Sequence, residues 1–424
     1  MLFRSSRPRA IEIATPVRLD AHTSRPLLRL IAGVVLAQTC GMLGSSAFAS
    51  TLTELARLWR LDSTHAGWIS SAYFLGYTCA VPLLVALTDR VDPRKIYLAG
   101  CLIGACAALG FAHLARGLWS ASLWQALAGA GVGATYMPGL RILTTRLGER
   151  ARIRAVPYYT TTFAVGTSLS YMLCGWMAAH HGWRSAFLAA AAAPLASAVL
   201  VVLATWNIPP VVAEATPTRH PLDLRPALRN RQSMAYVLAY GGHCWEMFAF
   251  RAWLPAFLLF AWHLYGRADG AVAVSRWSML IVLIGVPASI LGAESVNAAT
   301  RNRNIRHFEF ASIGLCLAAV ALLSHALWLT LAALFAYNFA IAADSGALTA
   351  GAIASSRPEE QGATLAVYAL VGFFGAGIGP LAVGRALDST GGFHSAHAWY
   401  FGFAAMGIGS ALAAIAISGE TRVE

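Results

Sequence analysis

The sequence predicts an all-α membrane protein of twelve transmembrane helices, arranged as two six-helix halves with pseudo-two-fold symmetry. Three observations lead to this prediction. The 424 residues are 58% hydrophobic and only 12% charged, whereas an average soluble domain is about a quarter charged. Apolar stretches of roughly 20 residues, the length that crosses a hydrocarbon core as a helix, recur along the whole chain. One long polar interruption divides these stretches six against six.

Each expected span is an apolar run bounded by polar residues, glycine or proline. Very short connections, as at 115–117 and around His325, require neighbouring helices to be antiparallel. In chain order the spans are Leu28–Thr51, Ala66–Leu87, Ile96–Leu114, Leu118–Leu140, Val156–Ala178, Ser185–Trp206, Ser233–Phe260, Trp277–Val296, Phe308–His325, Leu327–Ala350, Leu365–Gly384 and Ala398–Ser418.

The longest polar interruption after the N-terminal tail is rich in proline and separates the two halves. Repeated halves are typical of transporters that bind their substrate near the bilayer midplane. The expected organisation is a cytoplasmic tail (1–27), an N-terminal half (28–206), a cytoplasmic linker (207–232), a C-terminal half (233–418) and a second cytoplasmic tail (419–424).

The net charge of +12 reflects the orientation of the chain in the membrane. Most arginine and lysine residues lie in segments that are cytoplasmic if both termini are cytoplasmic, as the positive-inside rule requires. We therefore expect a multi-pass protein of the bacterial cytoplasmic (inner) membrane. The charges are spread over short loops, which argues against nucleic-acid binding, and the N-terminal tail lacks the apolar core of a signal peptide.

The sequence lacks the motifs that are typical of other classes of protein. No HExxH or GxSxG motif is present, so we expect no enzyme, no cofactor and no metal site. Glycine runs at 129–133 and 372–380 lie inside apolar spans without a phosphate-loop lysine, and they favour close helix packing. No disulfide framework is expected, because all the cysteines lie within spans: Cys40, Cys79, Cys101, Cys106, Cys174, Cys244 and Cys316.

Two loops carry the features of a known family. Residues 89–95 read Asp-Arg-Val-Asp-Pro-Arg-Lys and residues 182–187 read Gly-Trp-Arg-Ser-Ala-Phe. They resemble the DRxGRR/K and GWRxxF loops of the major facilitator superfamily, and they occur where that family has them. The resemblance implies the family's fold and transport by alternating access. Residues 243–246 and 251–255 are also similar to a branch grouped with nitrate/nitrite and cyanate-type permeases.

The chain departs from family patterns at three places. Gln125 stands where the family's RxxxG segment has arginine, and Cys174-Gly175-Trp176 replaces the Gly-Pro of drug exporters, which argues against multidrug efflux. Neither the second nor the eighth span has an arginine in its interior, unlike nitrate exchangers of the family. Nitrate is therefore not the expected substrate.

Ionisable residues inside spans are costly and usually face the bundle interior. The resemblance implies that the first, fourth, seventh and tenth helices line the transport path, and the polar candidates fall on these helices. The expected substrate- and proton-binding residues are Gln38, Arg141, His243, Glu246, Arg251 and Asp344.

On the seventh helix, His243, Glu246, Phe250 and Trp253 share one face. Arg251 lies away from Glu246 around the axis, so we expect its partner on another helix. Alternatives remain open at each position. Glu246 and Asp344 could belong to a buried ion pair that only fixes helix register, and His243 could simply hydrogen-bond a neighbouring helix. An arginine at a helix end, such as Arg141, can extend to the interface.

A cytoplasmic gate is expected after the second helix. Asp89, Arg90 and Arg94 would hold the two halves together in the outward-facing state, and Glu294 occupies the matching position of the second half. A charged residue at a helix end can equally be solvated.

The expected function is secondary active transport of a small polar or anionic solute, as a proton-coupled symporter acting as a monomer. Its partners would be the solute, the proton and the lipid bilayer. An efflux antiporter for drugs or metabolites is one alternative, and a passive facilitator or channel, which would need neither gate nor buried acid, is another.

Overall fold

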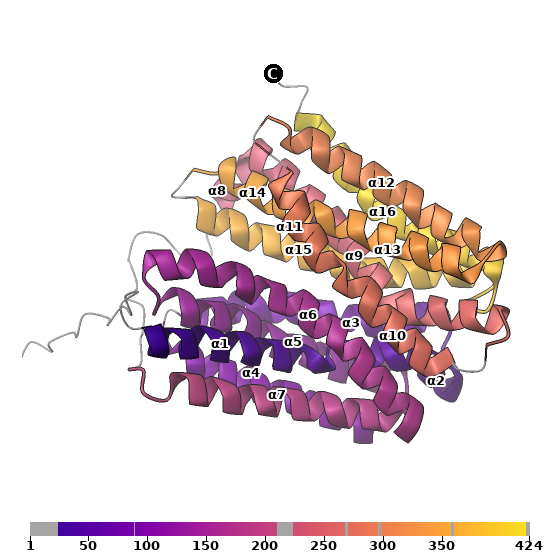
Figure 1. Ribbon diagram of the computed structural model, residues 1–424, viewed down its shortest axis with the longest axis horizontal. Helices are drawn as coiled ribbons and strands as arrows, with labels where there is room; N and C mark the ends of the chain where they lie inside the picture. The colour runs from indigo at the N-terminus through magenta and orange to yellow at the C-terminus, as the bar shows by residue number, and fades with distance from the viewer. Residues whose placement is uncertain are drawn as a thin grey trace, which may run out of the picture.

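The computed structural model describes residues 24–88, 90–209, 224–267, 270–295, 297, 299–357 and 360–420. Within these residues the regular elements are all helices (Figure 1). Nine spans in the described part of the chain are long and apolar enough to cross a membrane. Three further helices of similar length complete a set of twelve spans: α3 (Ser63–Leu87), α5 (Leu118–Thr144) and α6 (Glu149–His181). Residues 1–23 of the expected N-terminal tail and residues 210–223 of the expected linker lie outside the described residues, whereas residues 24–27 already belong to the first helix.

The N-terminal half contains six spans, the first of which is broken by a short 3₁₀ turn. Its elements are α1 (Ser24–Gly41), η1 (Met42–Gly44), α2 (Ala47–Trp59), α3 (Ser63–Leu87), α4 (Pro93–Leu114), α5 (Leu118–Thr144), α6 (Glu149–His181) and α7 (Trp183–Thr205).

The C-terminal half repeats this number of spans. Its elements are α8 (Arg225–Arg229), α9 (Arg231–Leu264), α10 (Gly270–Leu283), α11 (Gly285–Glu294), α12 (Arg301–Ala321), η2 (Leu322–Ser324), α13 (Leu327–Ala343), α14 (Ser345–Ala354), α15 (Gln361–Ser389) and α16 (Ala396–Glu420). Both α8 and the start of α9 fall in the segment expected to be linker.

Several helices differ from the expected spans for identifiable reasons. The first span continues to Trp59, because the polar residues of α2 lower its hydropathy without preventing a helix, and Arg60 ends it in the left-handed conformation (φ 52°). The eighth span breaks at Ile284, between α10 and α11. Pro287 has no N–H to donate to the carbonyl four residues earlier, which favours a break there. The tenth span breaks at Asp344, between α13 and α14.

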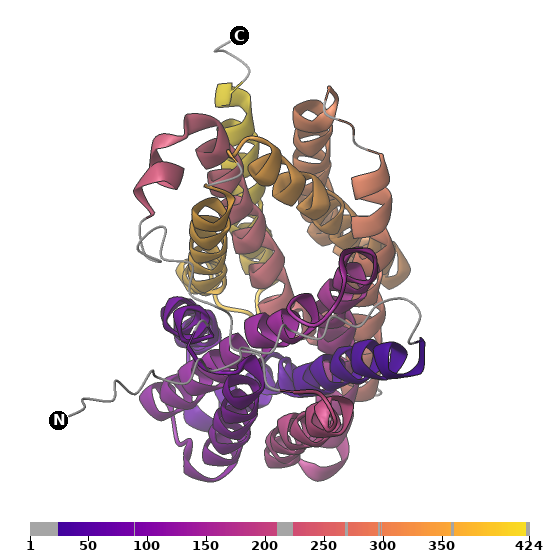
Figure 2. The same ribbon diagram turned by 90° about the vertical axis from the view of Figure 1, so that its left-hand side faces the viewer.

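The two halves lie side by side, and the most extensive contacts between them are those of α3 with α15 and of α6 with α10 (Figure 1). We call the end of the bundle where α1 begins the linker end and the other end the opposite end. The halves diverge toward the linker end, which Figure 2 shows face on.

The contacts between α3 and α15 start at the opposite end and reach the middle of the bundle. Gly67 faces the Pro380 carbonyl, where a larger side chain would not fit, and Gly377 contacts Leu75. Further along, the Tyr77 and Phe373 rings stack with centroids 3.9 Å apart. The halves are therefore closed against each other from the opposite end to mid-depth.

Candidate functional site

A cavity lies between the two halves at the level of residues 70–74 of α3, within the depth over which α3 and α15 are in contact. It is lined from the N-terminal half by residues of η1–α2, α3, α5 and α6, and from the other half by α9 alone. Its lining is aromatic and hydroxylic, with one charged residue and no carboxylate: Ser45, Ser46, Phe48, Ala49, Ser70, Tyr73, Phe74, Gln125, Phe163, Thr167, Tyr171, Phe248, Arg251 and Ala252. Such a cavity suits a solute that carries a negative charge on an apolar body.

Arg251 supplies the charge of this central cavity. Its side chain is 7% exposed, and its guanidinium carbon lies 5.6 Å from the centroid of the Phe248 ring. The Nε and Nη1 groups have no hydrogen-bond partner, and no carboxylate in the described part of the chain forms an ion pair with it. The partner expected on another helix is therefore missing from these residues. A buried guanidinium with unused donors is suited to receive an anion.

Aromatic rings fix the position of this arginine. The Phe248 ring packs against Phe74, with centroids 4.6 Å apart, and against Phe163 at 6.0 Å. The Tyr171 hydroxyl crosses between the halves and donates a 2.5 Å hydrogen bond to the Arg251 carbonyl. The Tyr73 hydroxyl in the cavity wall has no hydrogen-bond partner among the described residues. The cavity thus offers a cation, flat apolar walls and one unused hydroxyl.

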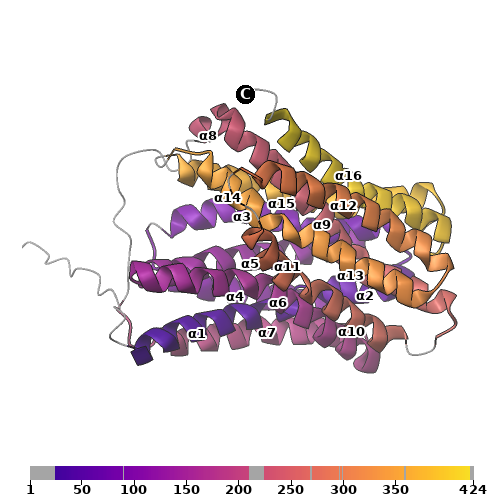
Figure 3. The ribbon, with the colours of Figure 1, turned by 45° about the horizontal axis from the view of Figure 1, so that its top comes forward.

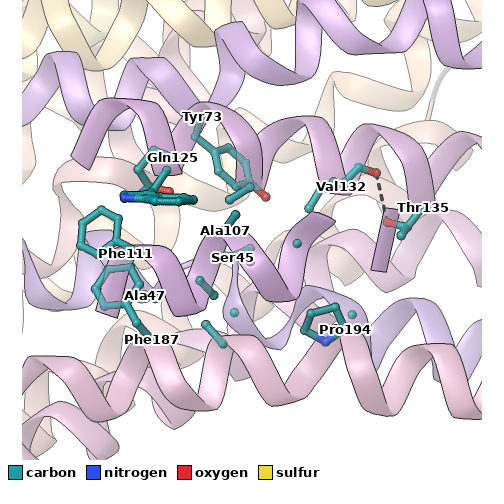
Figure 4. Close-up of a pocket in the computed structure, with 18 of the residues that line it drawn as sticks. Ser45, Ala47, Tyr73, Ala107, Phe111, Gln125, Val132, Thr135, Phe187 and Pro194 are labelled. Carbon is teal, nitrogen blue, oxygen red and sulfur yellow. Dashed lines mark hydrogen bonds between the residues drawn. The ribbon is translucent and has the colours of Figure 1, made fainter. Parts of the chain in front are cut away.

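A second cavity adjoins the first inside the N-terminal half and shares Ser45, Tyr73 and Gln125 with it (Figure 4). Phe111 and Phe187 stack at one side of it, with centroids 3.9 Å apart. Glycine residues of α4 and α5 line its floor. Gln125, which replaces the family's arginine, therefore lies between the two cavities and leaves Arg251 as the charged residue of the central one.

Glu246 belongs to a separate, buried polar cluster inside the C-terminal half, where α9, α12, α13 and α16 pack together (Figure 3). Its carboxylate accepts hydrogen bonds from the hydroxyls of Ser312 (2.9 Å), Tyr337 (3.0 Å) and Ser410. Glu246 is 1% exposed and does not line the central cavity.

His243 and Asp344 belong to the same cluster. The His243 Nδ1 lies 2.8 Å from Asp344 Oδ1, and both side chains are 2% exposed. These two residues and Glu246 are thus buried in the bundle, where the sequence analysis placed them. They surround a polar centre that is distinct from the cavity at Arg251.

Glu309 on α12 completes this cluster and was missed by the sequence predictions. It is 2% exposed and its carboxyl is in side-chain hydrogen-bonding contact with that of Asp344. An acidic residue near the start of a span, eight residues after Arg301, looks like an interfacial residue in the sequence. The signal that could have found it is its place inside the apolar run that begins at Phe308.

The two remaining binding candidates lie apart from both sites. Gln38 is fully buried in the N-terminal half, where its Oε1 accepts hydrogen bonds from the Tyr97 hydroxyl (3.3 Å) and the Tyr159 hydroxyl (3.2 Å). Arg141 lies in the last turn of α5 and is half-buried. Neither lines the central cavity.

The expected cytoplasmic gate is only partly visible. Asp89 lies outside the described residues, while Arg90 and Glu294 are exposed. Arg94 donates to Asp92 (2.7 Å) and to the carbonyls of Thr205 and Ile208, which lie in the N-terminal half and at the start of the linker, and not in the C-terminal half. The latch expected for the outward-facing state is therefore not formed by Arg94 in this structure.

Asp92 is the centre of this group of charges. It caps α4 through the Arg94 N–H and lies 3.4 Å from the buried Arg146 guanidinium. Burial opposes its ionisation, but the hydrogen bonds from Arg94 and the charge of Arg146 outweigh burial and lower the pKa of Asp92 below its ordinary value. Asp92 and Arg94 thus tie the start of α4 to the turn after α5 and to the end of α7.

Comparisons with known proteins agree with this architecture. Residues 34–380 match the family model of the Major Facilitator Superfamily. A gallate transporter of Pseudomonas putida is 25% identical over 377 residues, which cover 80% of each protein.

Two solved structures share the fold. The inward-facing, unoccupied form of a bacterial homologue of the human lysosomal transporter Spinster has a TM-score of 0.76 at 14% identity and covers 93% of this chain and 96% of its own. The nucleoside transporter NupG has a TM-score of 0.68 at 13% identity, and the match covers 93% of this chain and 98% of the NupG chain. The prediction of an all-α membrane fold in two halves is confirmed. The chain belongs to the Major Facilitator Superfamily and is a transporter of the alternating-access kind, not an enzyme.

Proposed function

We propose that this protein is a proton-coupled symporter for a small organic anion whose carboxylate binds Arg251 in the central cavity. The observation that carries the proposal is the buried Arg251 guanidinium, which has no carboxylate partner in the described part of the chain and lines a cavity shared by both halves. Leaving such a charge unpaired costs several kcal/mol. A ligand that offsets this cost binds strongly.

The walls of the cavity favour an aromatic acid. Phe74, Phe163 and Phe248 provide flat apolar surface beside the guanidinium, and the Tyr73 hydroxyl has an unused donor. The relative named as a gallate transporter supports this class, because gallate is a benzoate that carries hydroxyl groups. The resemblance to nitrate/nitrite and cyanate-type permeases remains a prediction, and the aromatic lining favours a larger anion than nitrate.

The positive-inside rule indicates how the bundle is oriented across the membrane. With both termini in the cytoplasm of a bacterial cell and the chain inserted in the inner membrane, the linker end is cytoplasmic. The structure, closed at the opposite end, is then inward-facing. In the outward-facing state, Asp89, Arg90, Arg94 and Glu294 would form the cytoplasmic gate. We further propose that the linker at 207–232 separates the two six-helix halves and that the protein transports its substrate as a monomer.

Uptake by purified protein in liposomes tests the function. Labelled gallate and benzoate should accumulate when an inward proton gradient is imposed, and an ionophore that collapses the gradient should abolish accumulation. Cyclohexanecarboxylate and benzamide separate the contributions of ring and charge. Accumulation only when the gradient is reversed would favour the efflux antiporter, and equilibration without accumulation would favour the passive facilitator. Transport of none of the acids would refute the proposed substrate class.

A further inference from the structure

The C-terminal half buries four ionisable side chains that do not line the central cavity and therefore have no role in binding the proposed substrate there. His243, Glu246, Glu309 and Asp344 are each 1–2% exposed and come from α9, α12 and the junction of α13 with α14. None of the four lines the central cavity. Buried ionisable groups in a membrane protein are costly and need a partner or a proton.

The three carboxyl groups of this cluster differ in how many hydrogen-bond donors they have. Glu246 accepts from three hydroxyls, those of Ser312, Tyr337 and Ser410, so it can remain a carboxylate throughout. By contrast, Glu309 Oε1 and both Asp344 oxygens meet no well-formed hydrogen-bond donor among the described residues. These two carboxyls contact each other instead.

A hydrogen bond between two carboxyl groups requires a proton on one of them, because an ionised carboxylate is only an acceptor. Two ionised carboxylates that interact in a buried site would also repel each other strongly. The pair is therefore satisfied by one shared proton. When that proton leaves, the nearest positive charge available is His243, whose Nδ1 is 2.8 Å from Asp344 Oδ1 and whose Nε2 has no partner.

The surroundings supply no other cation to the pair within the described residues. The titratable groups that interact with Glu309 and Asp344 are His243 and Glu246, together with the neutral side chains of Cys244 and Tyr368. Arg251 lies on the same helix α9 as His243, eight residues further along, which places it about 12 Å away along the axis. The helix α9 thus connects the carboxyl pair with the central cavity.

We propose that Glu309 and Asp344 hold the coupling proton between them, with His243 as the group that delivers and removes it, and that Glu246 remains an anion that positions the cluster. This proposal rests on the proposed symport function. In the step, the shared carboxyl O–H breaks and its proton passes to the imidazole Nδ1, which leaves two carboxylates partly compensated by one imidazolium. The imidazolium then releases the proton to water and returns to neutral imidazole. Asp344 lies where the tenth span breaks, so a change of charge acts on a helix junction and on α9 together.

The first test needs no substrate. A buried protonated carboxyl has an infrared C=O stretch that is distinct from that of a carboxylate, and it can be followed in the purified protein as pH is raised. We expect one such band, lost in both Glu309→Gln and Asp344→Asn and kept in Glu246→Gln. A band that persists in the first two variants and disappears in Glu246→Gln would overturn the assignment. Melting temperature and elution volume establish that each isosteric variant is folded.

The second test separates coupling from transport. In liposomes, exchange of labelled for unlabelled gallate requires alternating access but no net proton movement. Glu309→Gln and Asp344→Asn should retain exchange within about threefold of wild type and lose accumulation driven by a proton gradient at least about tenfold, which corresponds to about 1.4 kcal/mol. Glu149→Gln, which changes an exposed carboxylate in the first turn of α6, is the control and should retain both activities. Full accumulation in Glu309→Gln and Asp344→Asn would refute the carboxyl pair, whereas absence of all gallate movement in wild type would refute the substrate class while leaving the infrared result in force.

Discussion

The Asp388 carboxylate joins the two halves by capping a helix that belongs to the other half. It accepts hydrogen bonds from the Ser63 N–H (2.9 Å), the Thr64 N–H (2.7 Å) and the Thr64 hydroxyl (2.5 Å), so the end of α15 is held at the N-terminus of α3. A carboxylate is favoured there, because the helix N-terminus carries free N–H donors and a partial positive charge. This contact closes the opposite end of the bundle in the described conformation.

The first prediction concerns this closure. Asp388→Asn loses the negative charge and one acceptor, which costs about 1 kcal/mol and shifts the equilibrium away from the closed opposite end by roughly fivefold. Spin labels on α3 and α15 at that end should show a larger population of long distances. Asp62→Asn is the matched control, because Asp62 accepts from the His65 N–H in the same first turn of α3 but contacts only its own half. Equal distance distributions in the two variants would mean that Asp388 has no role in closure.

The second prediction concerns Asp92 and pH. Its pKa is lowered in the folded protein, so it contributes stability that is present above the ordinary aspartate pKa and is lost as pH falls through the lowered value. Asp92→Asn should therefore lower the melting temperature near neutral pH, and the difference from wild type should shrink in strong acid. Melting curves of both proteins across the acid range measure this. A difference that grows on acidification would contradict the assigned sign.

The third prediction concerns the glycine run of α5. A Cβ at Gly129 would overlap the Tyr73 carbonyl oxygen of α3, which is backbone and cannot move aside cheaply, whereas a Cβ at Gly104 would only touch Pro194 at 3.8 Å. We expect Gly129→Ala to destabilise the protein by about 1–3 kcal/mol and Gly104→Ala to have little effect. Thermal unfolding in detergent compares them. Similar melting temperatures would mean that α3 and α5 do not need this close approach.

The fold could be predicted in detail because its signals are local. Apolar length and loop charge are read along the chain, and the linker prolines mark the division. The sequence also singled out His243, Glu246, Arg251 and Asp344, because an ionisable residue in an apolar run is rare.

The partners of these residues could not be predicted, since helix rotation and packing decide them. Arg251 was expected to have a partner on another helix and has no acidic one in the described residues, while Asp344 contacts Glu309 from a different span. Asp388 lies beyond the expected end of the eleventh span, at Gly384, where nothing in the sequence pattern assigns it a role. Its role appears only once the ends of α3 and α15 are brought together in space.

The most direct measurement of the central claim is the affinity of gallate for purified Arg251 variants. Arg251→Lys keeps the charge but loses the two-pronged guanidinium, and a charge-assisted hydrogen bond contributes about 1.5–3 kcal/mol, so its Kd should rise about tenfold to a hundredfold. Arg251→Ala should bind still more weakly. Arg276→Ala is the control, because this arginine lies on a span of the same half but is exposed and does not line the central cavity. Calorimetric titration of all four proteins at one pH gives the values. An unchanged Kd in both Arg251 variants would contradict the account, whereas a loss of affinity confined to them is the result that it predicts.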